Sequence, residues 1–242
     1  RSIMKKRICA LALTLALAAG GLSLASDLKM ADGHILPLGN EITLREADKS
    51  YVGKELQKEW NREKVEKEIL PAVKRMGLFG KGDALHEKMM AKQLGQLFEA
   101  TRFSQLQMET KEAFHQAVVM SVKLEEKDIA GWNEIIRAME KAHPGKIDIL
   151  GENRTLNLET IRESMKKEDG HDRFVYKKDG QTEFIYGSIF LFAEQYGVET
   201  PFYVFFIAAA DKGQFGVTAI YTNQATGRIM EPVLVKGAEG LR

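Results

Sequence analysis

Residues 202–207 have the sequence Phe-Tyr-Val-Phe-Phe-Ile, a run of aromatic and β-branched side chains without a charged residue. Residues of these types favour β-strands. Successive side chains of a strand point to opposite faces of its sheet, so both faces of this strand are largely apolar. A strand with two apolar faces is covered on both sides. We therefore expect residues 202–207 to lie inside a sheet that has other elements packed on each face.

The residues around this run predict further strands. Phe174–Tyr176 and Phe184–Tyr186 flank Asp179-Gly180, a pattern typical of a β-hairpin with a two-residue turn. Short connections containing glycine or proline separate the predicted strands, and strands joined in this way pair antiparallel. The strands expected besides the hairpin are 189–192, 202–210, 216–222 and 228–235.

The chain before residue 173 favours helices. Of the 20 aromatic residues, 13 lie between Phe174 and Tyr221, whereas Lys, Glu, Gln, Met and Ala dominate the middle of the chain. Hydroxyl, carboxylate and amide side chains at positions typical of helix starts predict N-caps, and residues 128–142 carry an apolar helical stripe. The predicted caps are Thr43 (with Glu46 in a capping box), Asp83 and Asn157.

Residues 102–124 allow two interpretations. Phe103, Leu106, Ala113 and Ala117 fit a helix, but residues 114–124 alternate between apolar and polar side chains and include three valines. Alternation with a period of two is typical of a strand. We favour a pair of strands here over a helix.

These patterns predict an α+β fold in which a helix-rich N-terminal half packs on a C-terminal antiparallel sheet of about five to seven strands. We expect one domain over residues 43–242, helical at 43–100, mixed at 101–168 and β-rich at 173–236. Residues 26–42 contain Gly33, Pro37 and Gly39, and we expect them to form an irregular leader.

The first 25 residues resemble an export signal. Lys5, Lys6 and Arg7 precede an apolar run from Ile8 to Leu17, and the small residues Ser23 and Ala25 fit a signal-peptidase site. We expect cleavage between Ala25 and Ser26, and export to the periplasm or the extracellular space of a bacterium. An uncleaved membrane anchor is the competing interpretation. No later run is apolar over about 18 residues, so we expect no membrane span after cleavage.

The charge balance and the single cysteine exclude several classes of function. Residues 26–242 carry 31 basic and 34 acidic side chains, whereas nucleic-acid binding by bulk charge needs an excess of clustered cations. Cys9 lies inside the predicted signal, so the rest of the chain has no disulfide, thiolate nucleophile or cysteine-bound metal. We expect no nucleic-acid partner.

The densest group of polar residues is Glu168-Asp169-Gly170-His171-Asp172. Carboxylates and an imidazole this close in sequence suit a divalent cation or acid–base chemistry. A solvated turn between a helix and a strand is the alternative that we favour, since Gly170 suits a turn and the spacing does not match a calcium-binding loop. Asp169, His171 and Asp172 are therefore weak candidates for a site.

The remaining motifs do not indicate catalysis. No two of the five histidines are three or four residues apart, so a helical zinc pair is absent, and Ser188 lacks the nucleophile-elbow pattern. Tyr186 and Tyr203 fit either a ligand groove or the core. We expect an exported envelope protein without a metal or cofactor. Its predicted role is that of a non-enzymatic accessory, chaperone-like or binding module for an unknown protein or small molecule. A periplasmic hydrolase built from dispersed Asp, Glu and His residues is the alternative.

Overall fold

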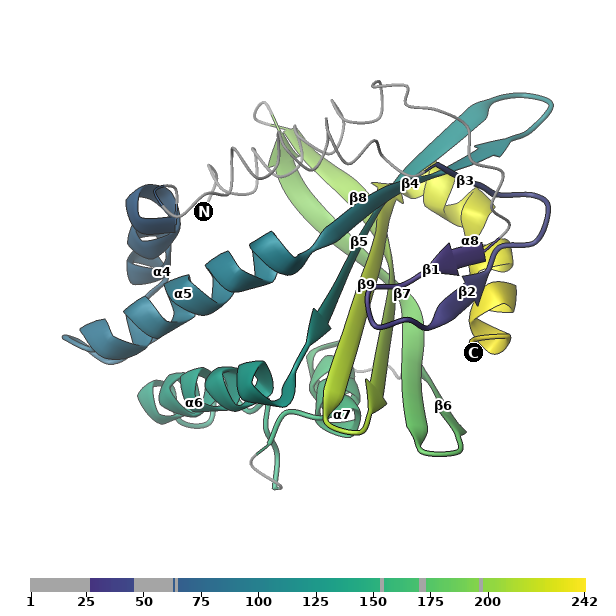
Figure 1. Cartoon of the computed structure of the whole chain (residues 1–242). Helices are drawn as coiled ribbons and strands as arrows, with labels where there is room; N and C mark the ends of the chain where they lie inside the picture. Colours follow the sequence, from purple (N-terminus) through teal and green to yellow (C-terminus); the bar gives the residue numbers. More distant parts are fainter. Residues whose placement is uncertain (1–26, 46–62, 64, 153–154, 170–172, 196–197) are drawn as a thin grey trace.

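A seven-stranded antiparallel sheet forms the centre of the molecule (Figure 1). The computed structural model describes residues 27–45, 63, 65–152, 155–169, 173–195 and 198–242. The strand order is β3-β4-β5-β9-β8-β7-β6, and every neighbouring pair is antiparallel. The strands are β3 (Thr43–Arg45), β4 (Arg102–Glu109), β5 (Phe114–Leu124), β6 (Val175–Asp179), β7 (Thr182–Gln195), β8 (Val198–Asp211) and β9 (Gln214–Asn223).

Strand β8 contains residues 202–207 and lies between β9 and β7, as the apolar run predicts. Tyr203, Phe205 and Ile207 point to the face covered by helix α8 (Gln224–Glu239) and by the small hairpin of β1 (Asp27–Lys29) and β2 (Ile35–Pro37). Phe206 and Ala208 point to the opposite face, where they pack with residues of helices α6 (Glu126–Ala142) and α7 (Leu158–Asp169). The expectation of cover on both faces is confirmed.

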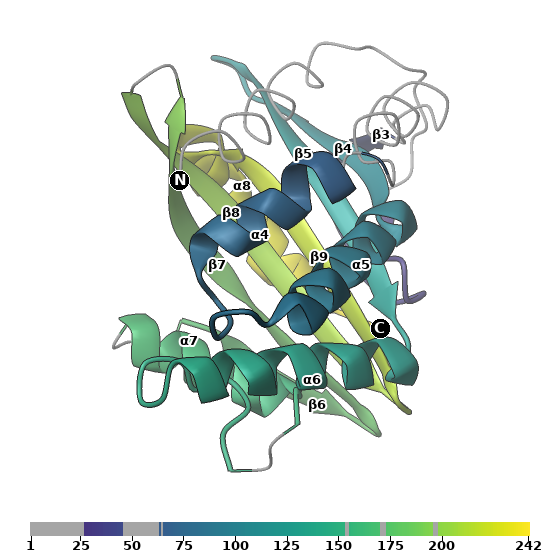
Figure 2. The ribbon, with the colours of Figure 1, turned by 90° about the vertical axis from the view of Figure 1, so that its left-hand side faces the viewer.

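Further helical segments lie beside α6 over the same face of the sheet (Figure 2). They are the short π-helix η1 (Val65–Ile69), α4 (Leu70–Met76) and α5 (Ala84–Ala100). Val73, Phe79, Ala91 and Ile135 form a separate apolar cluster that joins α4, α5 and α6. The face with α8 and the face with α4–α7 therefore have distinct cores.

Two of the predicted helix caps are confirmed. The backbone nitrogen of His86 donates to Asp83 Oδ1 at 3.2 Å at the start of α5. At the start of α7, Thr160 N donates to Asn157 Oδ1 and Asn157 N donates to Thr160 Oγ1, both at 2.9 Å. These side chains satisfy backbone donors that have no partner inside the helix.

The two predicted strand pairs are also present. Residues 102–124 form β4 and β5, with Phe103 opposite Met120 and Leu106 opposite Ala117. Strands β6 and β7 form the predicted hairpin, in which Asp179 pairs with Thr182. The two turn residues are therefore Gly180, at φ +60°, and Gln181, one position later than the sequence pattern indicates.

The predicted division into a helical front and a strand-rich back is wrong, although the α+β class stands. Strands β1–β5 belong to the front of the chain, and the predicted strand 228–235 lies in helix α8. Asn223 caps α8 by accepting from Thr226 N at 2.8 Å, and Met230, Leu234 and Ala238 form a buried stripe with a spacing of four. The β-favouring residues near Val233 concealed this helical spacing.

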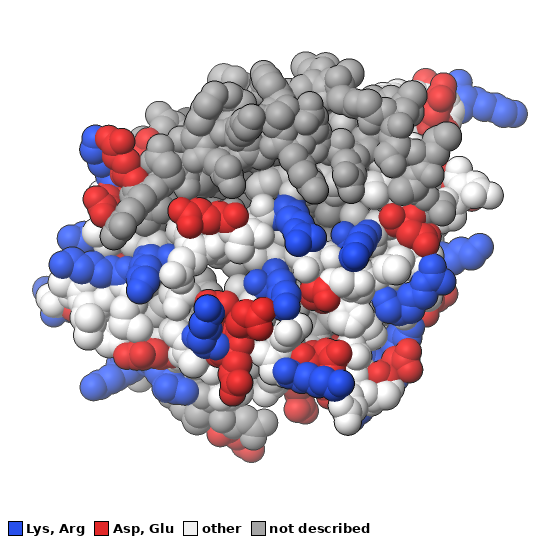
Figure 3. All heavy atoms as spheres, in the orientation of Figure 1, with Lys and Arg blue, Asp and Glu red and all other residues white. Residues whose placement is uncertain are grey.

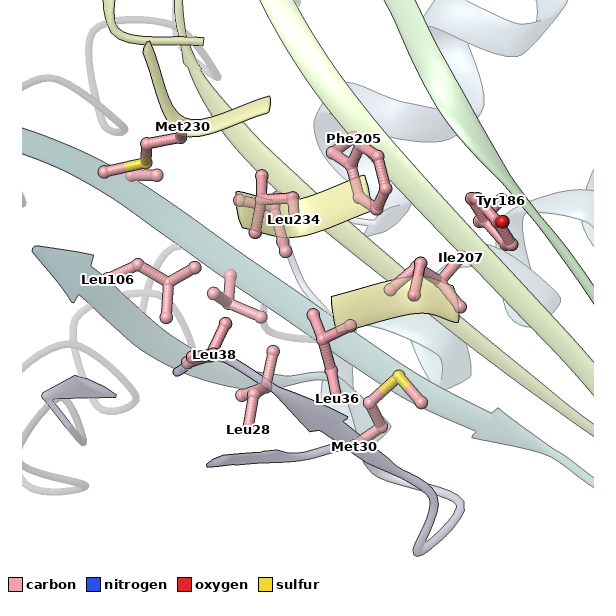
Figure 4. Close-up of a cluster of buried hydrophobic side chains, with 14 of the residues drawn as sticks. Leu28, Met30, Leu36, Leu38, Leu106, Tyr186, Phe205, Ile207, Met230 and Leu234 are labelled. Carbon is pink, nitrogen blue, oxygen red and sulfur yellow. The ribbon is translucent and has the colours of Figure 1, made fainter. Parts of the chain in front are cut away.

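The expectation of an irregular leader over residues 26–42 is also wrong. Residues 27–37 form the β1–β2 hairpin, in which Leu28 faces Leu36. Apolar side chains at alternate positions extend from this segment into the core beneath α8 (Figure 4). These side chains are Leu28, Met30, Leu36, Leu38 and Ile42.

The capping box predicted at Thr43 is not formed, because Thr43–Arg45 is the edge strand β3. Leu44 of this strand pairs opposite Leu106 of β4 and is buried. The helix expected after Thr43 falls on residues 46–62, outside the described residues. The division into a cleaved segment and one domain stays a prediction.

Candidate functional site

Most of the site residues predicted from the sequence lie outside the described residues. Asp169 is the last residue of α7. His171 and Asp172 lie outside the described residues, as do Ala25 and Ser26 at the predicted cleavage point. The polar cluster and the cleavage point therefore remain predictions.

A polar cavity of about 280 Å³ lies where the β1–β2 turn meets the ends of β8 and β9. Its floor is two cross-strand pairs, Ala209 with Gly216 and Asp211 with Gln214. The turn supplies two polar side chains. We call this cavity the dyad pocket, and its lining residues are Asp32, Gly33, His34, Ala209, Asp211, Gln214, Gly216 and Arg242.

The β1–β2 turn has a tight backbone conformation. Met30 N donates to His34 O at 2.8 Å, and Gly33 N donates to Met30 O at 3.0 Å. Gly33 has a φ of +95°, a conformation that glycine adopts at little cost. Asp32 Oδ1 accepts from His34 N at 3.0 Å, which is an Asx-type contact. The local sequence Asp-Gly-His therefore fixes the conformation of the turn.

Asp32 and His34 form a hydrogen-bonded dyad. His34 Nδ1 donates to Asp32 Oδ2 at 2.8 Å, and the Asp32 side chain is only 5% exposed. The edge of the His34 ring meets Phe184, with ring centroids 5.1 Å apart and planes at 80°. Because Nδ1 donates to the carboxylate, Nε2 of the neutral imidazole is an acceptor. Nε2 has no partner among the described residues.

Two features of the sheet hold the turn in place. Ala31 N donates to Ser121 Oγ at 2.8 Å, and Ser121 Oγ lies 2.8 Å from Thr218 Oγ1, so β5 and β9 both support the turn. Gly216 leaves room for the dyad, since a Cβ at this position would lie 1.8 Å from Asp32 Oδ2. Any side chain at position 216 would displace the carboxylate.

Asp211 supplies a third polar group to the pocket. Its Oδ1 is buried and has no hydrogen-bond partner among the described residues. A buried polar atom without a partner costs about 1–3 kcal/mol, and more when it is charged. Arg242, at the rim, donates from a guanidinium nitrogen to Asp27 Oδ2 at 3.0 Å. No described residue of the pocket therefore supplies a hydrogen-bond donor for Asp211 Oδ1.

The other described histidines are held by local structure. His86 Nδ1 lies 2.8 Å from Asp83 Oδ2 at the start of α5, and His143 Nε2 lies 2.7 Å from the carbonyl oxygen of Gly77. His115 Nδ1 lies 3.2 Å from Thr226 Oγ1, which links β5 to α8. None of these three imidazoles lines the dyad pocket.

Sequence reasoning missed Asp32 and His34, although the signal is short and visible. The tripeptide Asp-Gly-His occurs at residues 32–34 and again at 169–171. Only the second copy has further acidic residues directly beside it, and this density of charge makes it the more prominent candidate in the sequence. The first copy lies between two alternating apolar segments and so occupies a hairpin turn, where the aspartate and histidine contact each other.

Tyr186 and Tyr203 belong to the core and do not line a groove. Both pack beneath α8, and the Tyr203 side chain is fully buried. Tyr203 Oη is buried without a hydrogen-bond partner in the described structure, close to Ser188 and Glu231, which bond to each other at 2.6 Å. Burial first, and then the Glu231 carboxylate, raise the pKa of Tyr203 far above its ordinary value of 10.0.

This raised pKa makes Tyr203 a source of alkaline instability. Folding holds the phenol protonated while the unfolded chain ionises it, so the contribution to stability is complete below about pH 10 and is lost as the pH rises further. Tyr203→Phe lacks the phenol and therefore this loss. When the pH is raised from about 8 to about 11, we expect the free energy of unfolding of the variant to gain about 1 kcal/mol relative to that of the wild type. Urea unfolding at both pH values measures the difference. Parallel pH profiles for the two proteins would contradict the expectation.

A larger hollow of about 760 Å³ lies between η1, α4 and α5. The polar side chains along it are exposed and include both acidic and basic groups. They are Glu66, Lys88, Lys92, Gln96 and Glu99. No buried polar atom without a partner lies in its lining among the described residues. It therefore lacks the converging polar groups that distinguish the dyad pocket.

Several other kinds of site find no support in the described part of the chain. Basic and acidic side chains intermingle on the face shown in Figure 3, without a large patch of one sign. No group of three or more His, Cys, Asp or Glu side chains within the described ranges is placed to hold a metal ion. None of the described helices is long and apolar enough to cross a membrane. No protein-family model, no curated protein and no solved structure matches the chain.

Proposed function

We propose that this chain is an exported binding module of the bacterial envelope, and that its ligand is a small polar molecule held in the dyad pocket. The observation that carries the proposal is the imidazole of His34. Its orientation is fixed by the buried Asp32, and His34 lines a cavity that is also lined by Asp211, whose buried Oδ1 has no partner among the described residues. A few converging polar groups in a concave site are typical of ligand pockets.

The size of the cavity limits the ligand. At about 280 Å³ the pocket lies just below the usual range for small-molecule sites, about 300–1,000 Å³, so a molecule of a few non-hydrogen atoms fits. Export is supported by the cationic and apolar pattern of residues 5–25, which is a sequence argument.

The hydrolase alternative draws on the same dyad, since a histidine oriented by a carboxylate is a common general base. The pocket lining contains no Ser, Thr, Cys, Tyr or Lys that would serve as a nucleophile, so His34 would have to activate water. We favour binding because the lining provides polar groups that hold a ligand and no side chain of these nucleophilic types.

A fragment screen by saturation-transfer NMR tests the proposal. We expect small polar fragments to bind the wild type and to bind His34→Gln about tenfold more weakly, because the substitution removes the ring acceptor. Asp83→Asn is the matched control, since Asp83 also pairs with a histidine at 2.8 Å but lies at the start of α5, outside the pocket. The pocket would be refuted as the binding site if the fragments bound His34→Gln and Asp83→Asn equally well, or if no fragment bound the wild type. Turnover of an ester that is lost in His34→Gln would favour the hydrolase.

A further inference from the structure

The dyad pocket presents hydrogen-bond acceptors that lack donors. Asp211 Oδ1 is buried without a partner among the described residues. In the neutral imidazole of His34, donation from Nδ1 to Asp32 leaves Nε2 as an acceptor. Each oxygen of the Asp32 carboxylate accepts one hydrogen bond within the turn and has a second lone pair. A ligand that satisfies this set must bring N–H or O–H donors.

The charges around the pocket favour a cation. Asp32 and Asp211 contribute two carboxylates to the lining. Three cationic side chains in this part of the structure have oxygen partners. Arg242 contacts Asp27 at 3.0 Å, Lys177 donates to the carbonyl of Glu239 at 2.8 Å, and Lys123, opposite Gly216 in β5, contacts Glu125 at 3.0 Å. An anionic ligand would face two carboxylates, and Arg242, the single Lys or Arg side chain among the described lining residues, already contacts Asp27.

We infer that the dyad pocket binds a small organic cation that carries a primary ammonium group. The Asp211 carboxylate and His34 Nε2 accept the N–H protons of this group. This inference rests on the proposed function and names its ligand class. An ammonium brings three donors and a positive charge, and hydrogen bonds between charged groups are stronger than neutral ones. The facing pair Ala209 and Gly216 is small, and it leaves room for the carbon next to the nitrogen.

The probe for this inference is ethanolamine, with ethylene glycol and glycolate as neutral and anionic molecules of similar size. In ¹H–¹⁵N NMR titrations of the full chain, we expect ethanolamine to shift the amide signals of residues 32–34 saturably, with a dissociation constant on the order of 1 mM. Ethylene glycol and glycolate should bind at least about tenfold more weakly. This comparison uses the wild type and does not depend on the folding of a variant.

Two variants test whether the cation binds beside Asp211. Asp211→Asn should weaken ethanolamine binding about tenfold and leave the weak binding of ethylene glycol unchanged, because only the charged probe loses an ionic partner. Asp83→Asn, which changes a carboxylate paired with His86 outside the pocket, should have no effect on either probe. Ethanolamine affinity that is the same in Asp211→Asn and wild type would overturn the inference.

The outcomes of these experiments distinguish a wrong ligand class from a wrong binding site. Glycolate binding as strongly as ethanolamine at residues 32–34, or fragment hits in the pocket with no response to ethanolamine, would overturn the cation and leave the binding module standing. A silent ethanolamine titration together with a fragment screen without hits would overturn both, and would mean that solvent alone satisfies Asp211.

Discussion

Replacing Leu36 by alanine should lower the free energy of unfolding by about 3 kcal/mol, because it removes a fully buried side chain and leaves a cavity. Leu36 belongs to β2 and to the apolar cluster that contains Leu106, Ile207 and Leu234 (Figure 4), so it is part of the core that joins the hairpin to β4, β8 and α8. Denaturant unfolding measures the loss. If the hairpin were not packed on the sheet, Leu36→Ala would lower the free energy of unfolding by less than about 0.5 kcal/mol.

Leu85→Ala is the matched control for this variant. Leu85 is 65% exposed near the start of α5, so the same change in side chain should alter stability by less than about 0.5 kcal/mol. Equal losses for the two variants would contradict the docking of the β1–β2 hairpin on the sheet. They would also remove the support that holds Asp32 and His34 over the ends of β8 and β9.

Gly227→Ala should destabilise the protein by about 2 kcal/mol, although alanine favours helices more than glycine does. A Cβ at this position of α8 would lie 2.1 Å from Tyr203 Cγ and 2.5 Å from Tyr203 Cβ. Tyr203 is held in the middle of β8, so the helix itself would have to lift from the sheet. Overpacking of this kind costs about 3 kcal/mol, and the helix propensity of alanine returns about 1 kcal/mol.

Gly131→Ala in α6 separates the packing effect from the helix propensity. The Cβ there would meet only the amide end of Gln93, a flexible side chain that can turn away. We therefore expect this variant to be neutral or stabilised by up to about 1 kcal/mol. Thermal unfolding of the two variants is the measurement, and a loss in Gly131→Ala as large as in Gly227→Ala would show that close contact with Tyr203 is not the cause.

The parts of the fold that follow from the sequence are those set by neighbouring residues. The two apolar faces of residues 202–207, the caps at Asp83 and Asn157, and the alternation of residues 114–124 each depend on a few positions in a row. Helix α8 was predicted as a strand because valines around Pro232 favour β structure. The buried spacing of Met230, Leu234 and Ala238 only becomes decisive when the sheet beneath it is present.

The candidate site could not be predicted for a different reason. Asp32 and His34 are near each other in sequence, but the pocket also needs Asp211, Gly216 and Arg242. These residues come together only after the hairpin docks on the ends of β8 and β9. Gly216 shows the limit well, because its φ is unremarkable and only the nearby Asp32 carboxylate explains why position 216 has no side chain.

The pairing of β5 with β9 has a consequence for how the molecule reaches its native state. Val118 lies opposite Tyr221, so this one ladder closes a loop of about 100 residues, whereas β6 to β9 are joined by hairpins. Loop closure over such a distance costs entropy before any contact rewards it, and pairings of this kind slow folding. We therefore expect the four C-terminal strands to pair first, and the earlier half of the chain to assemble on them.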